Sequence, residues 1–289
     1  MGAQYDRSEE NLGNIVALEH INVLVPDQRP ATLFYMAGLG LTRDPYLMAS
    51  VTNMWANCGK SQFHTPHGAP QVLRGTVGIV LPSRDELLDR LKKVKPHLKG
   101  TAFSYKAKND HVDTTCPWGN RIRVHEPDRK RFGRMQLGMP YIEFDVPNGT
   151  ARGIARFYNE IMATPAKVKG DAAHVSAGPN QEMIFREKKG KQAKYDGHHV
   201  AIYIADFSGP YDRLAERGLI SRETDQYEYR FQDIIDLDTG KVLFVIEHEV
   251  RSMTHPLAFR PLVNRNPNQS NTNFAAGHET TSWSLPTGA

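Results

Sequence analysis

Cysteine is scarce in this chain of 289 residues, and long apolar runs are absent. The two cysteines, Cys58 and Cys116, lie far apart and outside any C-x-x-C spacing, so the sequence predicts neither a disulfide framework nor a thiolate zinc site. No stretch approaches the roughly 20 apolar residues that a helix needs to cross a bilayer, and the start MGAQYDRSEE lacks the features of a secretion signal. We therefore expect a cytoplasmic protein with no membrane partner, and nitrogen and oxygen ligands for any metal.

A strong charge of one sign is absent as well. The chain has 36 lysines and arginines against 32 acidic residues, a formal net charge of +4. Two short basic runs, residues 129–134 and 188–191, favour exposed linkers over nucleic-acid patches. We therefore expect no nucleic-acid partner.

What the chain does contain is a repeated order of elements. An extended segment, a loop, an amphipathic helix and further extended runs recur four times, about every 60 residues. The opening strands are expected at residues 20–25, 75–80, 141–146 and 198–204. The helix expected at 84–94 carries a stripe of leucines on one face, which is what a helix needs to cover a sheet.

The repeats and the segments between them predict a domain organisation. The polar segment 129–137 is expected to link a first domain, 17–128, to a second domain, 138–252. Residues 1–16 form an N-terminal arm, and residues 253–289 form an irregular tail without either periodicity. A tail of this kind packs on the surface, packs on a neighbouring subunit or is partly disordered, so the sequence leaves a homo-oligomer open.

Two of the opening strands carry a resemblance to a known superfamily. The segments EHINVLVP at 19–26 and GHHVAIYI at 197–204 resemble opening strands of the vicinal oxygen chelate superfamily, which includes glyoxalase I and the type I extradiol dioxygenases. The likeness covers roughly residues 17–252 and implies an α+β fold of four βαβββ modules. Pairs of modules would form two domains, each with a cup-shaped mixed sheet. Because many reactions share this scaffold, the resemblance predicts the fold more closely than the function.

The resemblance also implies a metal site. In this superfamily the ligands of one divalent ion come from the first and last strands of the paired modules. The family's first-strand ligand position corresponds to His20 and His199, whereas the other two modules have Thr76 and Tyr141 there. The favoured arrangement pairs the first module with the fourth. Pairing of the third with the fourth, as in extradiol enzymes, would place Tyr141 in the site and weaken it.

The closing strand of the fourth module supplies the expected carboxylate. The segment FVIEHEVR at 244–251 resembles the closing strand of hydroxyphenylpyruvate dioxygenase, which places the ligand at Glu247. The family's usual spacing from the turn glycine does not select this residue. Either a bulge re-aims the strand, or His248 or Glu249 takes the ligand role, and these alternatives stay open.

Three further residues are candidates for catalysis. His64 falls where glyoxalases place an additional ligand, so it is either a fourth ligand or an acid–base group. Tyr229 and Arg230 lie on a strand expected to line the cup, where they would orient or protonate an oxyanion. Aromatic strand residues are also common in cores, so a packing role for Tyr229 stays open.

The expected ligand set allows three kinds of function. Two histidines and one carboxylate leave up to three metal positions open for a small substrate that chelates through vicinal oxygens, together with O2 or water. With Fe(II), the favoured metal, this is dioxygenase chemistry of the extradiol or 2-oxo-acid type. With Mn, Zn or Ni it is glyoxalase-like lyase or isomerase chemistry. The third function is non-catalytic binding of a small molecule.

Overall fold

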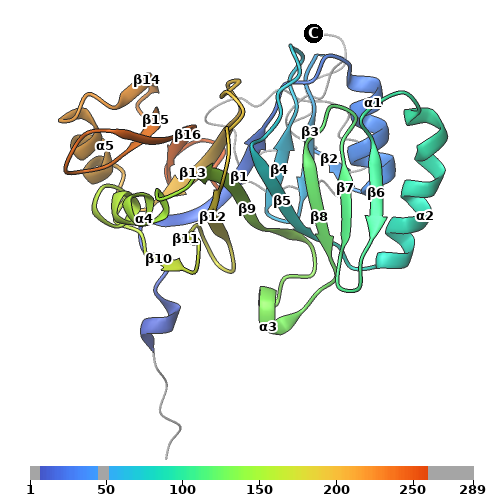
Figure 1. The fold of residues 1–289 in the computed structure, drawn as a ribbon, viewed down its shortest axis with the longest axis horizontal. Coiled ribbons are helices and arrows are strands. Elements are labelled where there is room, and N and C mark those ends of the chain that lie inside the picture. The colour runs from blue at the N-terminus through green and yellow to red at the C-terminus, as the bar shows by residue number, and fades with distance from the viewer. Residues whose placement is uncertain (1–6, 45–51, 260–289) are drawn as a thin grey trace, which may run out of the picture.

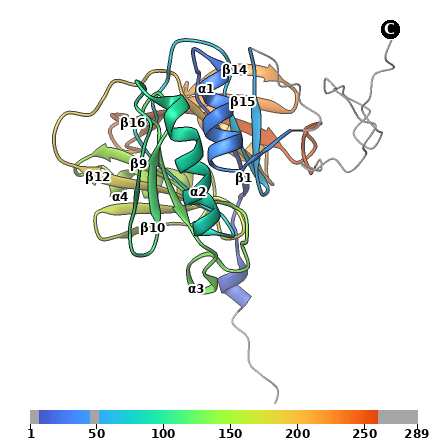
Figure 2. The same ribbon diagram turned by 90° about the vertical axis from the view of Figure 1, so that its right-hand side faces the viewer.

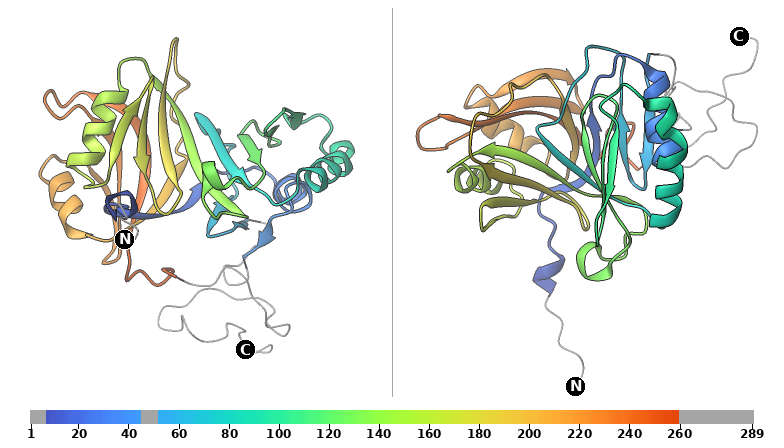
Figure 3. Two further views of the ribbon diagram at one scale, coloured as in Figure 1. Left: turned by 90° about the horizontal axis from the view of Figure 1, so that it is seen from below. Right: turned by 45° about the vertical axis from the view of Figure 1, so that its right-hand side comes forward.

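Two eight-stranded mixed sheets lie side by side in the computed structural model, which describes residues 7–44 and 52–259 (Figure 1). Of the predicted terminal segments, residues 1–6 and 260–289 lie outside the described residues. Helices α1 (Gln28–Thr32) and α2 (Arg84–Val94) lie at one end of the molecule, and α4 (Ala151–Glu160) and α5 (Ser208–Ala215) lie at the other (Figure 1); the same separation can be followed by colour in Figure 3. The predicted α+β class is confirmed.

The first sheet has the strand order β14-β15-β16-β13-β1-β4-β3-β2. Its strands are β1 (Ile15–Asn22), β2 (Thr42–Arg43), β3 (Trp55–Cys58), β4 (Ser61–His64), β13 (His199–Ile204), β14 (Ile220–Asp225), β15 (Glu228–Ile235) and β16 (Val242–Ser252). Antiparallel pairing of β1 with β13 joins the two halves of the sheet. This sheet therefore combines the first and fourth modules, as the favoured arrangement predicts.

The second sheet has the strand order β10-β11-β12-β9-β5-β8-β7-β6. Its strands are β5 (Gly75–Val80), β6 (Ser104–Ala107), β7 (Val112–Thr115), β8 (Arg121–His125), β9 (Gly138–Pro147), β10 (Ala166–Lys169), β11 (Ala172–Ser176) and β12 (Glu182–Lys188). Antiparallel pairing of β5 with β9 joins the second module to the third. Each sheet thus takes strands from both sides of residues 129–137. The predicted domains 17–128 and 138–252 therefore do not correspond to the two sheets.

The helices are short, and α4 packs against strands of both sheets. The helical segments are η1 (Arg7–Glu10), α1 (Gln28–Thr32), η2 (Leu33–Gly38), α2 (Arg84–Val94), η3 (Lys95–Leu98), α3 (Arg129–Phe132), α4 (Ala151–Glu160) and α5 (Ser208–Ala215). The α2 helix begins at Ser83, whose side chain accepts a hydrogen bond from the Glu86 N–H, and it buries Leu87, Leu91 and Val94. It lies beside α1 (Figure 2). Among the described residues, no helix has the length and apolar character needed to cross a bilayer.

A bulge in β1 sets the direction of the side chains that matter for the site. Leu18 pairs with Ile202, and His20 pairs with the next residue of β13, Ala201. Two residues of β1 therefore oppose one residue of its partner, which interrupts the alternation of faces. As a result, Glu19 and His20 are close enough to share a hydrogen bond, although they are neighbours on a strand.

Candidate metal centre

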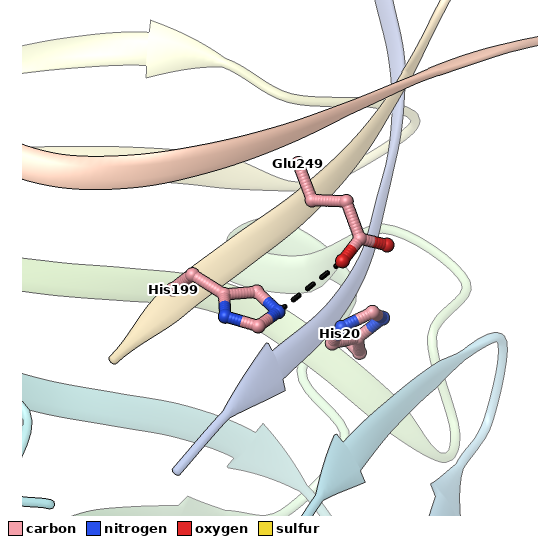
Figure 4. Close-up of side chains that lie close together, drawn as sticks. All are labelled: His20, His199 and Glu249. Atoms are coloured by element: carbon pink, nitrogen blue, oxygen red, sulfur yellow. Dashed lines mark ion pairs between the residues drawn. The ribbon is translucent and has the colours of Figure 1, made fainter. Parts of the chain in front are cut away.

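Three adjacent strands of the first sheet bring two histidines and one carboxylate together. His20 lies on β1, His199 on β13 and Glu249 on β16, and one potential ligand atom from each lies within 4.8 Å of the others (Figure 4). Nε2 of His199 lies 3.3 Å from the Glu249 carboxylate. All three residues are buried, with 0%, 9% and 3% of their surface exposed. The pairing of the first and fourth modules produces this cluster, because it places β1 next to β13.

His20 retains a ring nitrogen that a metal can use. Its Nδ1 is hydrogen-bonded to the carboxylate of Glu19. Its Nε2 is buried and has no hydrogen-bond partner within residues 7–44 and 52–259. Leaving a buried polar atom unpaired is costly, and a ligand bound to that atom removes the cost.

Glu247, the predicted carboxylate ligand, lies beside the cluster. It accepts hydrogen bonds from Nη1 of Arg230 at 2.6 Å and from Nε2 of Gln232 at 3.2 Å. Its nearest approach to His199 is 3.7 Å, at Nδ1, whereas Glu249 approaches Nε2 of the same ring. The geometry therefore favours Glu249, one of the two predicted alternatives, as the third ligand. His248, the other alternative, points into the core, where its ring stacks on Phe231 and Nε2 lies 2.6 Å from the Tyr158 hydroxyl.

The charges around the cluster suit a divalent cation. Arg230 contacts three carboxylates at 2.5 to 3.2 Å, and Arg251 also contacts three. The carboxylates are Glu19, Glu228, Glu247 and Glu249. Four carboxylates and two guanidinium groups give this largely buried site a formal excess of two negative charges. Uncompensated buried charge is unfavourable, and one divalent ion would balance it.

The protonation states of the cluster also fit metal binding. Burial lowers the pKa of His199 and outweighs the opposing effect of Glu249. Burial alone would raise the pKa of Glu249, but Arg251 and the nearby His199 hold it well below its usual value. A neutral imidazole and an ionised carboxylate are the forms that coordinate a metal.

His64 lies at the edge of this cluster. Its ring stacks on Trp55, with ring centroids 3.6 Å apart, and its Nε2 lies 2.8 Å from Oδ1 of Asn53. The centroid of its ring is 5.6 Å from that of His20. Burial, reinforced by His20 and His199, keeps the pKa of His64 well below its usual value. His64 is therefore a neutral imidazole in the same cup.

Arg230 and Tyr229 separate to opposite faces of β15. Arg230 faces the cup and contacts Glu247 and Glu249, as predicted for a residue that lines the site. Tyr229 lies in the core under α5, where its ring contacts Phe207 and Tyr211 at centroid distances of 5.0 and 5.2 Å. The prediction that Tyr229 lines the cup is wrong, because successive side chains of a strand point to opposite faces.

The second sheet has no comparable cluster at the matching positions. The Tyr141 ring packs against Gly78, and a Cβ atom at Gly78 would collide with it. The Tyr141 hydroxyl lies 2.9 Å from Nε2 of His125. An aromatic ring thus fills the place that an imidazole takes in the first sheet.

Three residues of the site were not predicted from the sequence. Glu19, Glu228 and Arg251 connect the ligand candidates to one another through ion pairs. In the sequence, the signal for Glu19 is that it directly precedes His20. Strand alternation nevertheless assigns it to the opposite face, unless a bulge is known.

No protein-family model matches the chain, and no curated protein matches it. Solved structures do match. A proposed dioxygenase from Bacillus subtilis has a TM-score of 0.56 at 16% identity, over 83% of this chain and 86% of its own. Glyoxalase I from Zea mays has a TM-score of 0.56 at 13% identity, over 82% of this chain and 92% of its own. With two sheets of paired βαβββ modules, this chain has the fold of the vicinal oxygen chelate superfamily.

Proposed function

We propose that this protein is a metal-dependent dioxygenase that acts on a small molecule with two vicinal oxygens, and that it binds Fe(II) through His20, His199 and Glu249. The observation that carries the proposal is the buried cluster itself. Nε2 of His20 has no hydrogen-bond partner in the part of the chain that the structure describes, and the surrounding charges leave an excess of two negative charges. Two histidines and one carboxylate are the ligands typical of Fe(II) oxygenases. Mn, Zn and Ni would accept the same ligands.

The residues of the cup suggest how such a substrate would be handled. Bound Fe(II) would hold both substrate oxygens and allow electrons to pass from the substrate to O2. Trp55 and His64 form a stacked aromatic pair beside His20, and a flat ring would pack against this pair. His64, as a neutral imidazole, would accept the proton that a substrate hydroxyl loses on binding. Arg230 would hold Glu247 and Glu249 in place during the reaction.

The structural comparisons are compatible with more than one reaction. The Bacillus subtilis protein is described as a proposed dioxygenase, and the Zea mays protein as glyoxalase I. The similarity to both is at the level of the fold, so the choice between oxygenase and lyase chemistry depends on the site. We favour the oxygenase because the cluster has three ligand residues and His64 lies outside it, which leaves positions for both a chelating substrate and O2.

Metal analysis of two matched variants tests the proposal. Glu249→Gln and Glu247→Gln each remove one negative charge from the same strand, but only Glu249 belongs to the cluster. After anaerobic reconstitution with Fe(II), we expect one equivalent of iron in the wild type and in Glu247→Gln, and a loss of iron from Glu249→Gln. Iron retained in Glu249→Gln and lost from Glu247→Gln would return the ligand role to Glu247.

Oxygen consumption then separates the possible reactions. The iron-loaded protein is expected to consume O2 when catechols or 2-oxo acids are added, as measured with an oxygen electrode. Turnover of a hemithioacetal without O2 uptake by the Zn or Ni form would instead show a lyase. A wild type that binds none of these metals would overturn the enzyme proposal and favour a small-molecule binder.

A further inference from the structure

Glu19 occupies an unusual position for an acidic residue on a central strand. It lies in the β1 bulge, between two neighbouring strands, and only 7% of its surface is exposed. Its carboxylate contacts Nδ1 of His20 and also Nη1 of Arg251, at 3.1 Å in the latter case. A buried carboxylate is unfavourable unless it is paired, and Glu19 is paired with a ligand candidate and a guanidinium group.

The contact with His20 determines which ring nitrogen is available. An ionised carboxylate can only accept hydrogen bonds, so Nδ1 of His20 must carry the proton that is shared with Glu19. In a neutral imidazole this leaves the lone pair on Nε2, the atom that has no partner among the described residues. The carboxylate therefore selects the tautomer in which Nε2 can bind a metal.

Arg251 extends this arrangement to a second ligand. Besides Glu19, its guanidinium group contacts Glu249 and, at 3.3 Å, Glu228. One rigid planar group therefore joins the carboxylate partner of His20 to the carboxylate of the cluster, although these residues lie on β1 and β16, with β13 between them.

We propose that Glu19 is a positioning residue: it holds His20 in the Nδ1–H tautomer and, through Arg251, keeps His20 and Glu249 correctly spaced for a divalent metal. The inference rests on the proposed metal site and assigns to it a carboxylate that does not itself coordinate the ion. Partners of this kind fix the orientation of a histidine ligand and raise its basicity.

Glu228 provides a matched control. It is as buried as Glu19, with 5% of its surface exposed, and it contacts the same guanidinium group. It lies on β15, which is separated from β1 by β16 and β13. Glu228→Gln and Glu19→Gln therefore remove the same charge from the same network, but only Glu19→Gln changes the partner of His20.

The first experiment measures Fe(II) affinity anaerobically by competition with a chromophoric chelator. Loss of a hydrogen-bonding partner of a histidine ligand costs about 10- to 100-fold in metal affinity. We expect Glu19→Gln to weaken Fe(II) binding within this range. The fold-loss of affinity in Glu228→Gln should be roughly ten times smaller than in Glu19→Gln. Equal losses in the two variants would mean that net charge alone matters and would overturn the positioning role, as would wild-type affinity in Glu19→Gln.

The second experiment reads the tautomer in the wild-type protein without metal, and a variant serves only to assign the His20 signals. Proton–nitrogen NMR of protein labelled with 15N-histidine, with the His20 signals assigned from their loss in His20→Gln, reports the tautomer directly. We expect the proton on Nδ1, and a proton on Nε2 would overturn the inference. A wild type that binds no metal would instead overturn the proposed function, and the metal role of Glu19 would fall with it. Metal binding that is unaffected by Glu19→Gln would overturn the present inference alone.

Discussion

At the scale of single residues, burial decides which histidines stay neutral. His125 ends β8 in the second sheet, with 2% of its surface exposed, and its Nε2 lies within hydrogen-bond distance of the Tyr141 hydroxyl. Burial lowers the pKa of His125 to about 4, and Arg131, His111 and Arg123 act in the same direction. In the unfolded chain a histidine takes up its proton near pH 6.5, so the unfolded state binds more protons between these two values. Folding stability must therefore fall as the pH drops through this range.

We expect His125→Gln to remove part of this pH dependence. Glutamine can still form a hydrogen bond with the Tyr141 hydroxyl, as donor or acceptor, but it does not titrate. Between pH 7 and pH 5, the free energy of unfolding of the wild type should fall more steeply than that of the variant, by at most about 1.4 kcal/mol per pH unit. Urea titrations at both pH values measure the difference. If the free energy of unfolding fell by the same amount in both proteins, His125 would not be a neutral, buried residue.

The choice between Glu247 and Glu249 shows how far the sequence can define the site. Residues two apart on a strand share a face, so the pattern of β16 allows either carboxylate to enter the cup. What separates them is the register across three strands: Ala201 of β13 pairs with both His20 and Glu249, which brings Glu249 level with His20. Register between distant strands is a tertiary property, and one sequence does not reveal it. His20 and His199, in contrast, could be predicted because both follow a family pattern within one strand.

At the scale of elements, close packing explains why only one sheet carries the cluster. The Tyr141 ring of β9 lies against Gly78 of β5, where a side chain would collide with it. In the sequence, Tyr141 takes the position that a histidine has in the first and fourth modules. The sequence did not indicate that a glycine on the neighbouring strand makes room for the ring.

Gly78→Ala should therefore destabilise the protein, by about 1–3 kcal/mol as for other overpacked cores. In a Tyr141→Ala background the same change should cost much less, because the ring is absent. A double-mutant cycle of urea unfolding measures this coupling. If the effects of the two substitutions are additive, the packing of the Tyr141 ring does not require a glycine at residue 78. Fe(II) binding in the first sheet should be the same in all the variants.

The bulge in β1 is the element-scale feature that the sequence did not reveal. Strand alternation alone puts Glu19 and His20 on opposite faces, and it correctly separates Tyr229 from Arg230 on β15. At Glu19 the rule fails because the register shifts between Leu18 and His20. A bulge forms only once β1 has β13 as its neighbour, so local sequence gives little sign of it.

At the scale of the whole molecule, the order of modules in the sheets depends on contacts between distant parts of the chain. The resemblance correctly predicted four modules and favoured the pairing of the first with the fourth. The predicted ranges 17–128 and 138–252 followed chain order, whereas the sheets pair the outer modules together and the inner modules together. Hydrogen bonds between strands that are far apart in sequence determine this order, and a composition change at residues 129–137 does not report on them.

One buried amide links the two sheets, and its removal tests how strongly they depend on each other. Gln181 precedes β12 of the second sheet and accepts a hydrogen bond from the Leu18 N–H at 3.2 Å. Its Nε2 lies 3.2 Å from the Leu18 carbonyl and 3.0 Å from both the Ser61 hydroxyl and the Met139 carbonyl. Leu18 and Ser61 belong to the first sheet and Met139 to the second, so the amide connects both sheets at the β1 bulge.

Gln181→Ala should lower the free energy of unfolding by about 1–3 kcal/mol, because it leaves the Leu18 N–H without its side-chain acceptor. Gln192→Ala is the matched control, since that amide bonds within the second sheet, to the Val146 and Lys188 carbonyls at 3.5 and 3.3 Å. Surface changes of this kind usually stay within about 0.5 kcal/mol of the wild type. Urea unfolding followed by fluorescence measures both variants. Leu18 borders the bulge that holds Glu19 and His20, so Gln181→Ala should also weaken Fe(II) binding. Wild-type Fe(II) affinity in this variant would show that the first sheet alone holds the cluster.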